Sequence, residues 1–413
     1  MKNIQIKWNL INSYKTKFTS SFTSKSNCSV CFSRKYIRIQ NFKKFQFFID
    51  SNSPKKINVE NVMCEDCYAV YQNPSYNKKG LKNLFSEAGM SYGSTASSKI
   101  DQINWLRKNK LIKKNLKILD VGCYDGSFLK MLPKNIKKFG LDIDKNVITK
   151  AKKKNKDIKF FFQNFETFKS KTKFDLIVMM HVLEHLRNPL VILKNLKNVS
   201  DDNTNLVIEV PILENHMSNK LDQLDGFITI QHITHFTQKS LSNIITQSGW
   251  KIVKQKKLYK YNGYRIICKK NNNKLPKLKV HIADKNLFKK YIEKYDSLRK
   301  KISTKIKATK FSNNSIIYGA GLHLEILYHV TNFFEKNFNK KFIILDGDPL
   351  KIGRTWRGIK IYNPKIISSF PDLKKSTFII SSYPYQPEIE FFLKSSGVKK
   401  QNIFKFYEKI KRY

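Results

Sequence analysis

The stretch Lys117-Ile118-Leu119-Asp120-Val121-Gly122-Cys123-Tyr124-Asp125-Gly126-Ser127-Phe128-Leu129 decides the fold. An aliphatic run ends in an acid, a turn with two glycines follows, and the residues from Ser127 onward are typical of a helix start. Gly122 and Gly126 lack a Cβ, so the backbone can bend sharply there and a ligand can lie against it. The order of strand, glycine turn and helix predicts a nucleotide-binding unit of an α/β sheet.

A second strand is predicted by Phe139-Gly140-Leu141-Asp142-Ile143-Asp144, and it ends in a carboxylate. In doubly wound sheets an acid at this position reaches the ribose hydroxyls of a bound nucleotide. The dinucleotide fingerprint G-x-G-x-x-G is absent, because Cys123 and Tyr124 follow Gly122. The pattern therefore indicates a nucleoside site without NAD, and a purely structural turn is the alternative.

These residues resemble the class I S-adenosylmethionine (SAM) methyltransferases. Asp120 to Gly126 matches the D-x-G-x-x-x-G loop of that family, and Asp142 stands where its ribose-binding acid stands. Gln163-Asn164-Phe165 falls at the segment that brackets adenine, and Phe174 to His181 matches the fourth strand. The resemblance implies SAM as cofactor, bound by Asp120, Gly122, Cys123, Asp125, Gly126, Asp142, Asn164, Phe165, Met180 and His181.

Strands and helices alternate through residues 115–270, which predicts a doubly wound Rossmann-like sheet with its ligands at the carboxyl ends of the strands. The expected strands are Ile118–Val121, Phe139–Leu141, Lys159–Phe162, Asp175–Met179, Leu206–Val210 and an antiparallel pair, Trp250–Lys257 and Tyr264–Lys269.

The strand, glycine turn and helix pattern recurs at Ser315 to His323, and Phe342 to Asp348 again gives a strand that ends in acids. We therefore expect a second Rossmann-like α/β domain over residues 286–413, after a linker at 271–285 and an amphipathic helix from about Asp284 to Lys307. The turn lacks a third glycine, so a dinucleotide is not expected. Binding of a substrate phosphate at the helix N-terminus, a structural role and a dimer-forming role stay open.

Four cysteines form two C-x-x-C pairs separated by 32 residues: Cys28, Cys31, Cys64 and Cys67. Two such pairs can present four thiolates to one tetrahedral Zn²⁺, and four sulfur ligands leave no open position for catalysis. A redox pair would need only one of the two. The spacing predicts a structural, zinc-ribbon-like module over residues 25–75, with a strand at Lys43–Ile49. A polar leader at 1–24 precedes it, and a connecting helical segment at 76–114 follows.

Histidines gather after the fourth and fifth expected strands. His181-Val182-Leu183-Glu184-His185 also matches H-x-x-E-H, the inverted zinc-protease signature, which needs both histidines facing a metal from one helix. Because His181 directly follows a strand, we expect it to line the cofactor or substrate pocket, with His185 an ordinary helix residue. His232 and His235 precede the expected helix Gln238–Ser248, and each offers a general base with a pKa near neutrality. For His235 the alternative is a helix cap together with Thr237.

The order of zinc module, SAM domain and C-terminal Rossmann-like domain resembles the bacterial sugar C-methyltransferases that act on nucleotide-linked deoxy-keto-sugars. In that family a Tyr-His-Glu-His segment carries the base. Aligned on Phe236, its second histidine falls on His232, while Thr229 and Gln231 replace the tyrosine and the glutamate. A tyrosine and serine segment near the substrate corresponds to Gly89–Ser98. The resemblance implies His232, His181, His235 and Tyr92 as catalytic candidates, with His232 preferred.

In this scheme a base removes a proton from a carbon next to a ketone, or from a hydroxyl, and the resulting nucleophile attacks the sulfonium methyl. Two alternatives stay open: an O-methyltransferase acting on a glycan or nucleotide-sugar hydroxyl, and a non-catalytic SAM-binding scaffold. A nucleic-acid methyltransferase is less favoured, because the Asn-Pro-Pro-Tyr segment of base N-methylating enzymes is missing where Met180-His181 stands.

The composition is strongly basic, with 79 Lys and Arg against 31 Asp and Glu and a net charge of +48. Such a surface attracts anionic partners, including nucleotide-activated substrates, anionic glycans, phospholipid and nucleic acid. The charge is spread along the chain, which argues against a dedicated nucleic-acid stripe. No apolar run approaches the roughly 20 residues of a membrane span, and no signal core is present. We expect a cytoplasmic protein with a small-molecule substrate, and a homodimer stays open.

Overall fold

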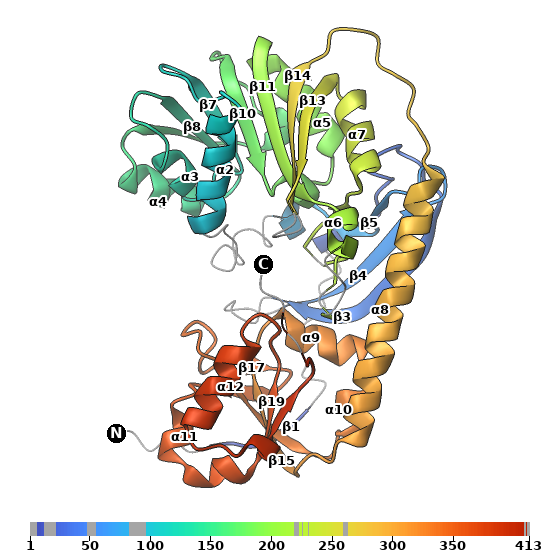
Figure 1. The fold of residues 1–413 in the computed structure, drawn as a ribbon, viewed down its shortest axis with the longest axis vertical. Helices are drawn as coiled ribbons and strands as arrows, with labels where there is room; N and C mark the ends of the chain where they lie inside the picture. The colour runs from blue at the N-terminus through green and yellow to red at the C-terminus, as the bar shows by residue number, and fades with distance from the viewer. Residues whose placement is uncertain are drawn as a thin grey trace.

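A computed structural model describes residues 6–11, 22–47, 55–81, 96–218, 223–224, 226–229, 231–258, 263–408 and 410. Two α/β domains lie at opposite ends of an elongated molecule (Figure 1). Helix α8 (Ile282–Ala308) runs along one side between them, and the hairpin of β3 (Tyr36–Phe47) and β4 (Lys55–Cys64) also spans the space between them. Within these residues, no helix is both long enough and apolar enough to cross a membrane.

The first domain contains the expected doubly wound sheet, in the order β13-β14-β11-β10-β7-β8-β9. Strands β7 to β11 are parallel, and the last two form an antiparallel hairpin at one edge. From β7 the chain builds outward to β8 and β9 on one side and continues with β10 and β11 on the other. Ligands bind at such a switch point. The strands are β7 (Lys117–Val121), β8 (Lys137–Asp142), β9 (Ile158–Phe162), β10 (Phe174–Met180), β11 (Ser200–Pro211), β13 (Trp250–Lys257) and β14 (Gly263–Lys270).

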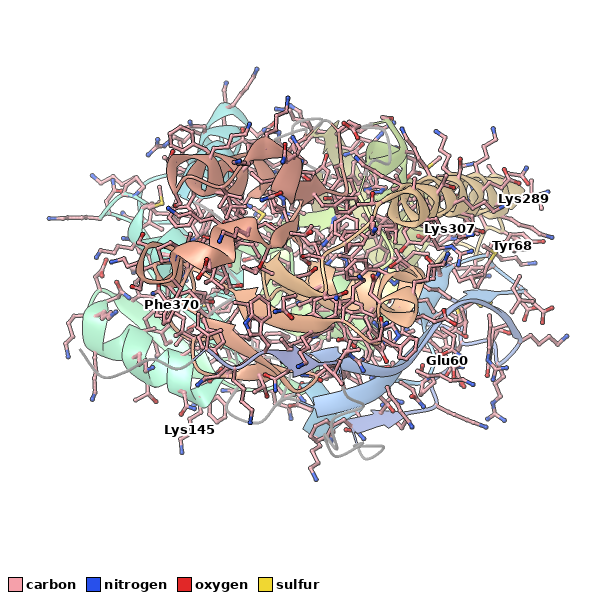
Figure 2. The ribbon with its side chains drawn as sticks, turned by 90° about the horizontal axis from the view of Figure 1, so that it is seen from below. Glu60, Tyr68, Lys145, Lys289, Lys307 and Phe370 are labelled. Atoms are coloured by element: carbon pink, nitrogen blue, oxygen red, sulfur yellow. The ribbon has the colours of Figure 1, made fainter. Side chains whose placement is uncertain are left out.

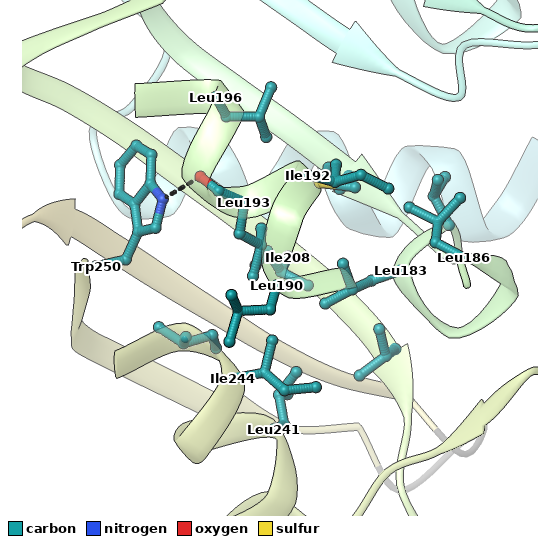
Figure 3. Packing of buried hydrophobic residues seen from close by; sticks show 14 of the residues in the cluster. Leu183, Leu186, Leu190, Ile192, Leu193, Leu196, Ile208, Leu241, Ile244 and Trp250 are labelled. Atoms are coloured by element: carbon teal, nitrogen blue, oxygen red, sulfur yellow. Dashed lines mark hydrogen bonds between the residues drawn. The ribbon is translucent and has the colours of Figure 1, made fainter. Parts of the chain in front are cut away.

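Apolar helix faces cover this sheet. Figure 3 shows leucines of α5 packed against Ile208 of β11 and against α7, and the Trp250 indole donating a hydrogen bond to the Leu193 carbonyl oxygen (2.9 Å). The expected helix at Ser127 is only one turn long, because Pro133 follows and disfavours helical geometry at the preceding residue. The helices are α2 (Ala96–Lys108), α3 (Ser127–Lys130), α4 (Lys145–Lys154), α5 (Pro189–Leu196), α6 (Leu213–Ser218) and α7 (Gln238–Gln247).

A four-stranded sheet in the order β12-β5-β4-β3 joins the cysteine segment to the first domain. Strand β12 (Thr234–His235) pairs antiparallel with β5 (Val70–Gln72), although 161 residues of chain separate them. The backbone N–H of Gln72 also donates to the Ile233 carbonyl oxygen at 2.9 Å. Strand β12, which contains His235, is therefore an edge strand of this N-terminal sheet. A short pair, β2 (Thr23–Ser24) with β6 (Ser75–Tyr76), lies beside it in sequence.

The second domain has the expected Rossmann-like sheet, in the order β17-β18-β16-β15-β19-β20. Strand β1 (Asn9–Leu10) pairs antiparallel with β16, so part of the segment expected to be a leader belongs to this sheet. The strands are β15 (Asn314–Tyr318), β16 (Lys341–Leu345), β17 (Thr355–Trp356), β18 (Ile359–Tyr362), β19 (Thr377–Ile380) and β20 (Ile403–Lys405). The helices are α9 (Leu322–Val330), α10 (Phe333–Lys336), α11 (Ile366–Ser369) and α12 (Gln386–Ser395).

A buried carboxylate ties the β3–β4 hairpin to the second domain. Glu325 of α9 is fully buried and accepts hydrogen bonds from the Gln46 backbone N–H (2.7 Å) and the Trp356 indole (2.8 Å). The Arg357 guanidinium donates to Glu325 from Nε at 3.0 Å and to the Lys44 carbonyl oxygen at 3.3 Å. The hairpin and the C-terminal domain therefore share one polar centre.

The basic residues lie over the whole surface. Figure 2 shows nitrogen-tipped side chains around the entire outline, among them Lys145 of α4 and both Lys289 and Lys307 of α8. The positive charge is therefore general to the surface, as the even distribution in the sequence predicts.

Candidate functional site

The four paired cysteines converge at the base of the β3–β4 hairpin. The Sγ atoms of Cys28 and Cys67 lie 3.6 Å apart, those of Cys31 and Cys64 lie 3.4 Å apart, and all four thiols are free. A tetrahedral zinc ion with Zn–S bonds of about 2.3 Å holds its sulfurs about 3.8 Å apart. The donor set and its spacing fit such an ion.

The two C-x-x-C segments have the same backbone conformation. Phe32 and Tyr68, each directly after a second cysteine, both have φ of 62°. In each segment the amide of this residue donates to the carbonyl oxygen of the first cysteine, and the amide of the first cysteine donates five residues ahead. Two equivalent turns therefore present two thiols each, as the spacing in the sequence predicts.

The glycine loop after β7 fits closely against its neighbours. Gly122 has φ of 79°, and a Cβ at this position would lie 2.4 Å from Val182 Cγ2. Gly126 has φ of 76°, and a Cβ there would lie 2.6 Å from the Phe160 ring. Both positions need glycine for conformation and for space.

We predict that Gly122→Ala weakens SAM binding at least tenfold. The left-handed conformation disfavours any side chain by roughly 1–2 kcal/mol, and the new methyl group would displace Val182, which lies next to His181. Isothermal titration with SAM measures the loss. Gly353→Ala, which also has positive φ but has open space around it, serves as the control and should bind SAM normally.

Two acids stand at the carboxyl ends of β7 and β8. Asp142 accepts hydrogen bonds from the backbone amides of Tyr124 (2.9 Å) and Asp144 (3.0 Å), which fixes its carboxylate beside the loop. Each oxygen keeps a further lone pair for a ligand. Burial and, secondarily, the Asp142 charge raise the pKa of Asp120 to about 7, while Lys99 of α2 opposes the shift. The pair forms a negative, desolvated site.

The other residues that are expected to bind the cofactor differ in how deeply they are buried. Cys123 is buried beneath the loop, so only its backbone faces outward, and Phe165 packs into the apolar core with 5% of its surface exposed. Asn164 caps a 3-10 turn through its side chain, and Asp125 bonds to the Ser127 amide. Met180 is partly buried at the end of β10. Tyr92 lies outside the described residues.

His181 follows β10 with φ of 56°, and its side chain is one-third exposed. Its Nε2 lies 3.0 Å from Glu209 of β11, and its Nδ1 lies 3.4 Å from Glu184. Burial alone would lower the pKa of His181, but the two carboxylates raise it to about 10. The protonated ring is therefore favoured, and it acts as a charge partner of Glu209 and Glu184 through its two nitrogens.

Glu209 also binds the buried Arg265 of β14, which reaches Asp101 at 3.0 Å. This network was not predicted from the sequence. The sequence does contain an indication of it, because Glu209 and Arg265 are opposite charges within apolar stretches of two strands, and buried charges are expected to pair. Burial alone would raise the pKa of Glu209, but the charges of His181 and Arg265 lower it to about 2.

Beside His181, the side chains of Glu184, His185 and His232 form a compact group, whose ligand atoms lie within 4.8 Å of one another. Glu184 and His185 belong to the 3-10 turn Leu183–His185, and not to the expected helix. The protease geometry, with His181 and His185 on one helix face, is therefore absent. Burial lowers the pKa of His232 well below its ordinary value, so this ring is neutral.

His235 is 1% exposed, and its Nε2 lies 3.0 Å from the Asn61 side-chain oxygen in β4. It therefore ties β12 to the N-terminal sheet, and its ring is buried away from solvent. Thr237 caps α7, as expected, and Ser240 completes a capping box. Phe162, 49% exposed at the end of β9, was not predicted and is the exposed aromatic ring nearest in sequence to the expected adenine segment.

Comparisons with known proteins give one family match and several similar structures. Residues 96–255 match a family described as a methyltransferase domain. The fold resembles a SAM-dependent methyltransferase of Clostridium acetobutylicum, with 10% identity, 47% of this chain and 99% of that one covered, and a TM-score of 0.38. It also resembles magnesium protoporphyrin IX methyltransferase of Synechocystis, with 14% identity, 47% and 100% covered, and a TM-score of 0.36.

A SAM-dependent methyltransferase of Aquifex aeolicus is similar at 18% identity, with 42% of this chain and 98% of that one covered and a TM-score of 0.33. No curated protein matches the chain at a significant level. The family match spans α2 to β13 and includes the glycine loop and both acids. Residues 96–255 are therefore a methyltransferase domain, and the chain is an enzyme of the SAM-dependent class.

Proposed function

We propose that the enzyme methylates a nucleotide-linked sugar, with SAM bound at the carboxyl ends of β7, β8 and β10. The observation that carries the proposal is the position of the histidines beside the glycine loop. His181 and His185 follow β10, and Val182 between them lies against Gly122 of the loop. In this proposal Asp142 binds the ribose hydroxyls and Asp120 stabilises the positive charge of the methionine portion. The net charge of +48 favours an acceptor that carries a diphosphate.

The acceptor must lose a proton before its oxygen or carbon attacks the methyl group. Of the histidines at the site, His232 is neutral and His181 is protonated, so the sequence-based preference for His232 as the proton acceptor remains our proposal. SAM already carries an activated methyl group. The protein therefore contributes mainly by aligning the acceptor with that methyl group and by placing charged side chains around the two reactants.

We also propose that Cys28, Cys31, Cys64 and Cys67 bind a structural Zn²⁺. The Sγ distances support this assignment, and an ion held by four thiolates has no open position for a reactant. Its effect on the reaction is indirect, because β5 of the cysteine module pairs with β12, which begins two residues after His232.

SAM affinity should rise with pH. Asp120 has a pKa of about 7, so it is largely protonated at pH 6 and ionised at pH 7.5. A cationic ligand binds the ionised form, which gives an increase of up to about tenfold over this interval. Calorimetric titrations at the two pH values measure it. Asp120→Asn should bind SAM more weakly and without this pH dependence, and a pH-independent affinity in the native protein would contradict the role of Asp120.

The function itself is tested with methyl-labelled SAM and a panel of nucleotide-linked sugars, both 4-keto and reduced, with NMR locating the new methyl group. Transfer to carbon that requires the keto group supports the C-methyltransferase proposal. Transfer to oxygen would instead support the O-methyltransferase alternative. Bound SAM with no transfer across the panel would overturn the nucleotide-sugar proposal.

A further inference from the structure

We propose that Glu184, His185 and His232 bind a second metal ion, of the first transition row, beside the SAM site and apart from the four cysteines. The three side chains come from two segments 46 residues apart, the 3-10 turn after β10 and the chain leading into β12. One ligand atom from each lies within 4.8 Å of the others.

The negative charge of the Glu184 carboxylate is only partly balanced by the described side chains around it. The residue is 1% exposed, and neither of its oxygens has a hydrogen-bond partner among the described residues. The nearest cationic group is the His181 ring at 3.4 Å, but that ring also lies 3.0 Å from the buried Glu209. Glu209 has a second cation in the buried Arg265, whereas Glu184 has the longer of the two contacts with His181. Because a buried carboxylate whose charge is only partly balanced costs free energy, a bound cation would satisfy Glu184.

The two histidines are oriented as metal ligands. His185 Nδ1 lies 3.0 Å from the Gln231 carbonyl oxygen, to which it donates in one tautomer, and in that tautomer Nε2, 3.9 Å from Glu184, carries the lone pair that a metal ligand needs. A hydrogen bond from one ring nitrogen to a carbonyl is the usual way in which a ligating histidine is held. His232 Nδ1 is buried and has no partner among the described residues. The two rings stand edge to face, with centroids 4.9 Å apart.

The spacing and the donor types define the ion. A tetrahedral ion with bonds of about 2.1 Å holds two ligand atoms about 3.4 Å apart, so side chains whose ligand atoms now lie within 4.8 Å would need to approach by up to about 1.4 Å. Two imidazoles and one carboxylate suit Zn²⁺ or Fe²⁺ and disfavour Mg²⁺ and Ca²⁺. Three protein ligands leave at least one position open, in contrast to the four-cysteine site.

The open position gives the site a role that rests on the proposed function. The acceptor's hydroxyl or keto oxygen would occupy it, and the ion would lower the pKa of the acceptor proton. That proton passes to water, the acceptor's electron pair forms the bond to the methyl carbon, and the carbon–sulfur bond breaks with its electrons going to sulfur. In this scheme His232 would be a ligand of the ion. The ion, and not the His232 ring, would then promote removal of the acceptor proton.

Metal titration of the full chain tests the site. After dialysis against Zn²⁺, the native protein should hold two ions per chain by plasma mass spectrometry, and Glu184→Gln and His232→Asn should each hold one. His281→Asn, which removes a histidine outside the group at the start of α8, should retain two. With Co²⁺ the four-cysteine site gives intense thiolate charge-transfer absorption, and the second equivalent should add only weak ligand-field bands.

One ion per chain in the native protein, with thiolate bands alone, would overturn the proposal. If a variant fails to fold, the stoichiometry and Co²⁺ spectrum of the native protein still decide the matter. A second ion without methyl transfer would leave the metal site standing and reject the proposed acceptor. Methyl transfer that persists at full rate in Glu184→Gln, with one ion lost, would reject the ion's part in the reaction.

Discussion

Replacing Glu325 by Gln should destabilise the C-terminal domain by about 3–5 kcal/mol, the cost of breaking a buried ion pair from one side. The change leaves the Arg357 guanidinium, itself 4% exposed, without its counter-charge. It also weakens the hydrogen bonds from the Gln46 amide and the Trp356 indole. Thermal and urea unfolding of the full chain, followed by tryptophan fluorescence, measure the loss.

Glu390→Gln is the matched control. Glu390 lies in the same domain and also pairs with two cations, Lys394 (2.7 Å) and Lys405 (2.6 Å), but it lies near the surface. Exposed pairs contribute roughly 0–1 kcal/mol, so this variant should unfold almost like the native protein. Equal unfolding of the two variants would show that Glu325 does not hold the hairpin. Replacing Glu325 and Arg357 together by Met and Leu should recover part of the stability.

Cys64→Ser should cause the largest loss of structure in the N-terminal module. Metal binding by four thiolates contributes about 10–16 kcal/mol to the folding of small zinc modules, and serine is a poor ligand for Zn²⁺. We expect the variant to lose one zinc equivalent and to be cleaved by trypsin between residues 25 and 75. Because β5 pairs with β12, methyl transfer should fall more than SAM binding does.

Cys268→Ala controls for the loss of a buried thiol, because Cys268 lies in β14 and outside the cysteine cluster. This variant should keep its full zinc content. Zinc content unchanged in Cys64→Ser would rule out the four-cysteine site, and equal losses of SAM binding and methyl transfer would reject the link from the cysteine module to the histidines.

The sequence was most informative where chemistry and structure are both local. The strands of the first sheet, strands β15 and β16 of the second, the N-cap at Thr237 and the two cysteine turns follow from periodicity, short spacing and glycine positions. The turn from Asp120 to Gly126 and the place of Asp142 beside it follow for the same reason, and their binding of SAM stays a prediction.

The sequence was least informative about pairings over long distances. Nothing in Thr234-His235 indicates that these residues join β5, because an edge pairing uses backbone hydrogen bonds that leave no pattern in the side chains. The same holds for β1 and β16. His185 was expected to be an ordinary helix residue, and its place beside His232 becomes visible only when the turn Leu183–His185 and the β12 segment are brought together.

The β3–β4 hairpin makes the two halves of the chain inseparable. One end carries Cys64, and its apolar residues Phe42, Phe45, Ile57 and Val59 belong to the same core cluster as the C-terminal sheet. A chain ending before α8 would therefore expose a long ribbon with an aromatic face, the kind of surface that promotes aggregation. The ribbon therefore couples the stabilities of the two domains, although each has its own sheet.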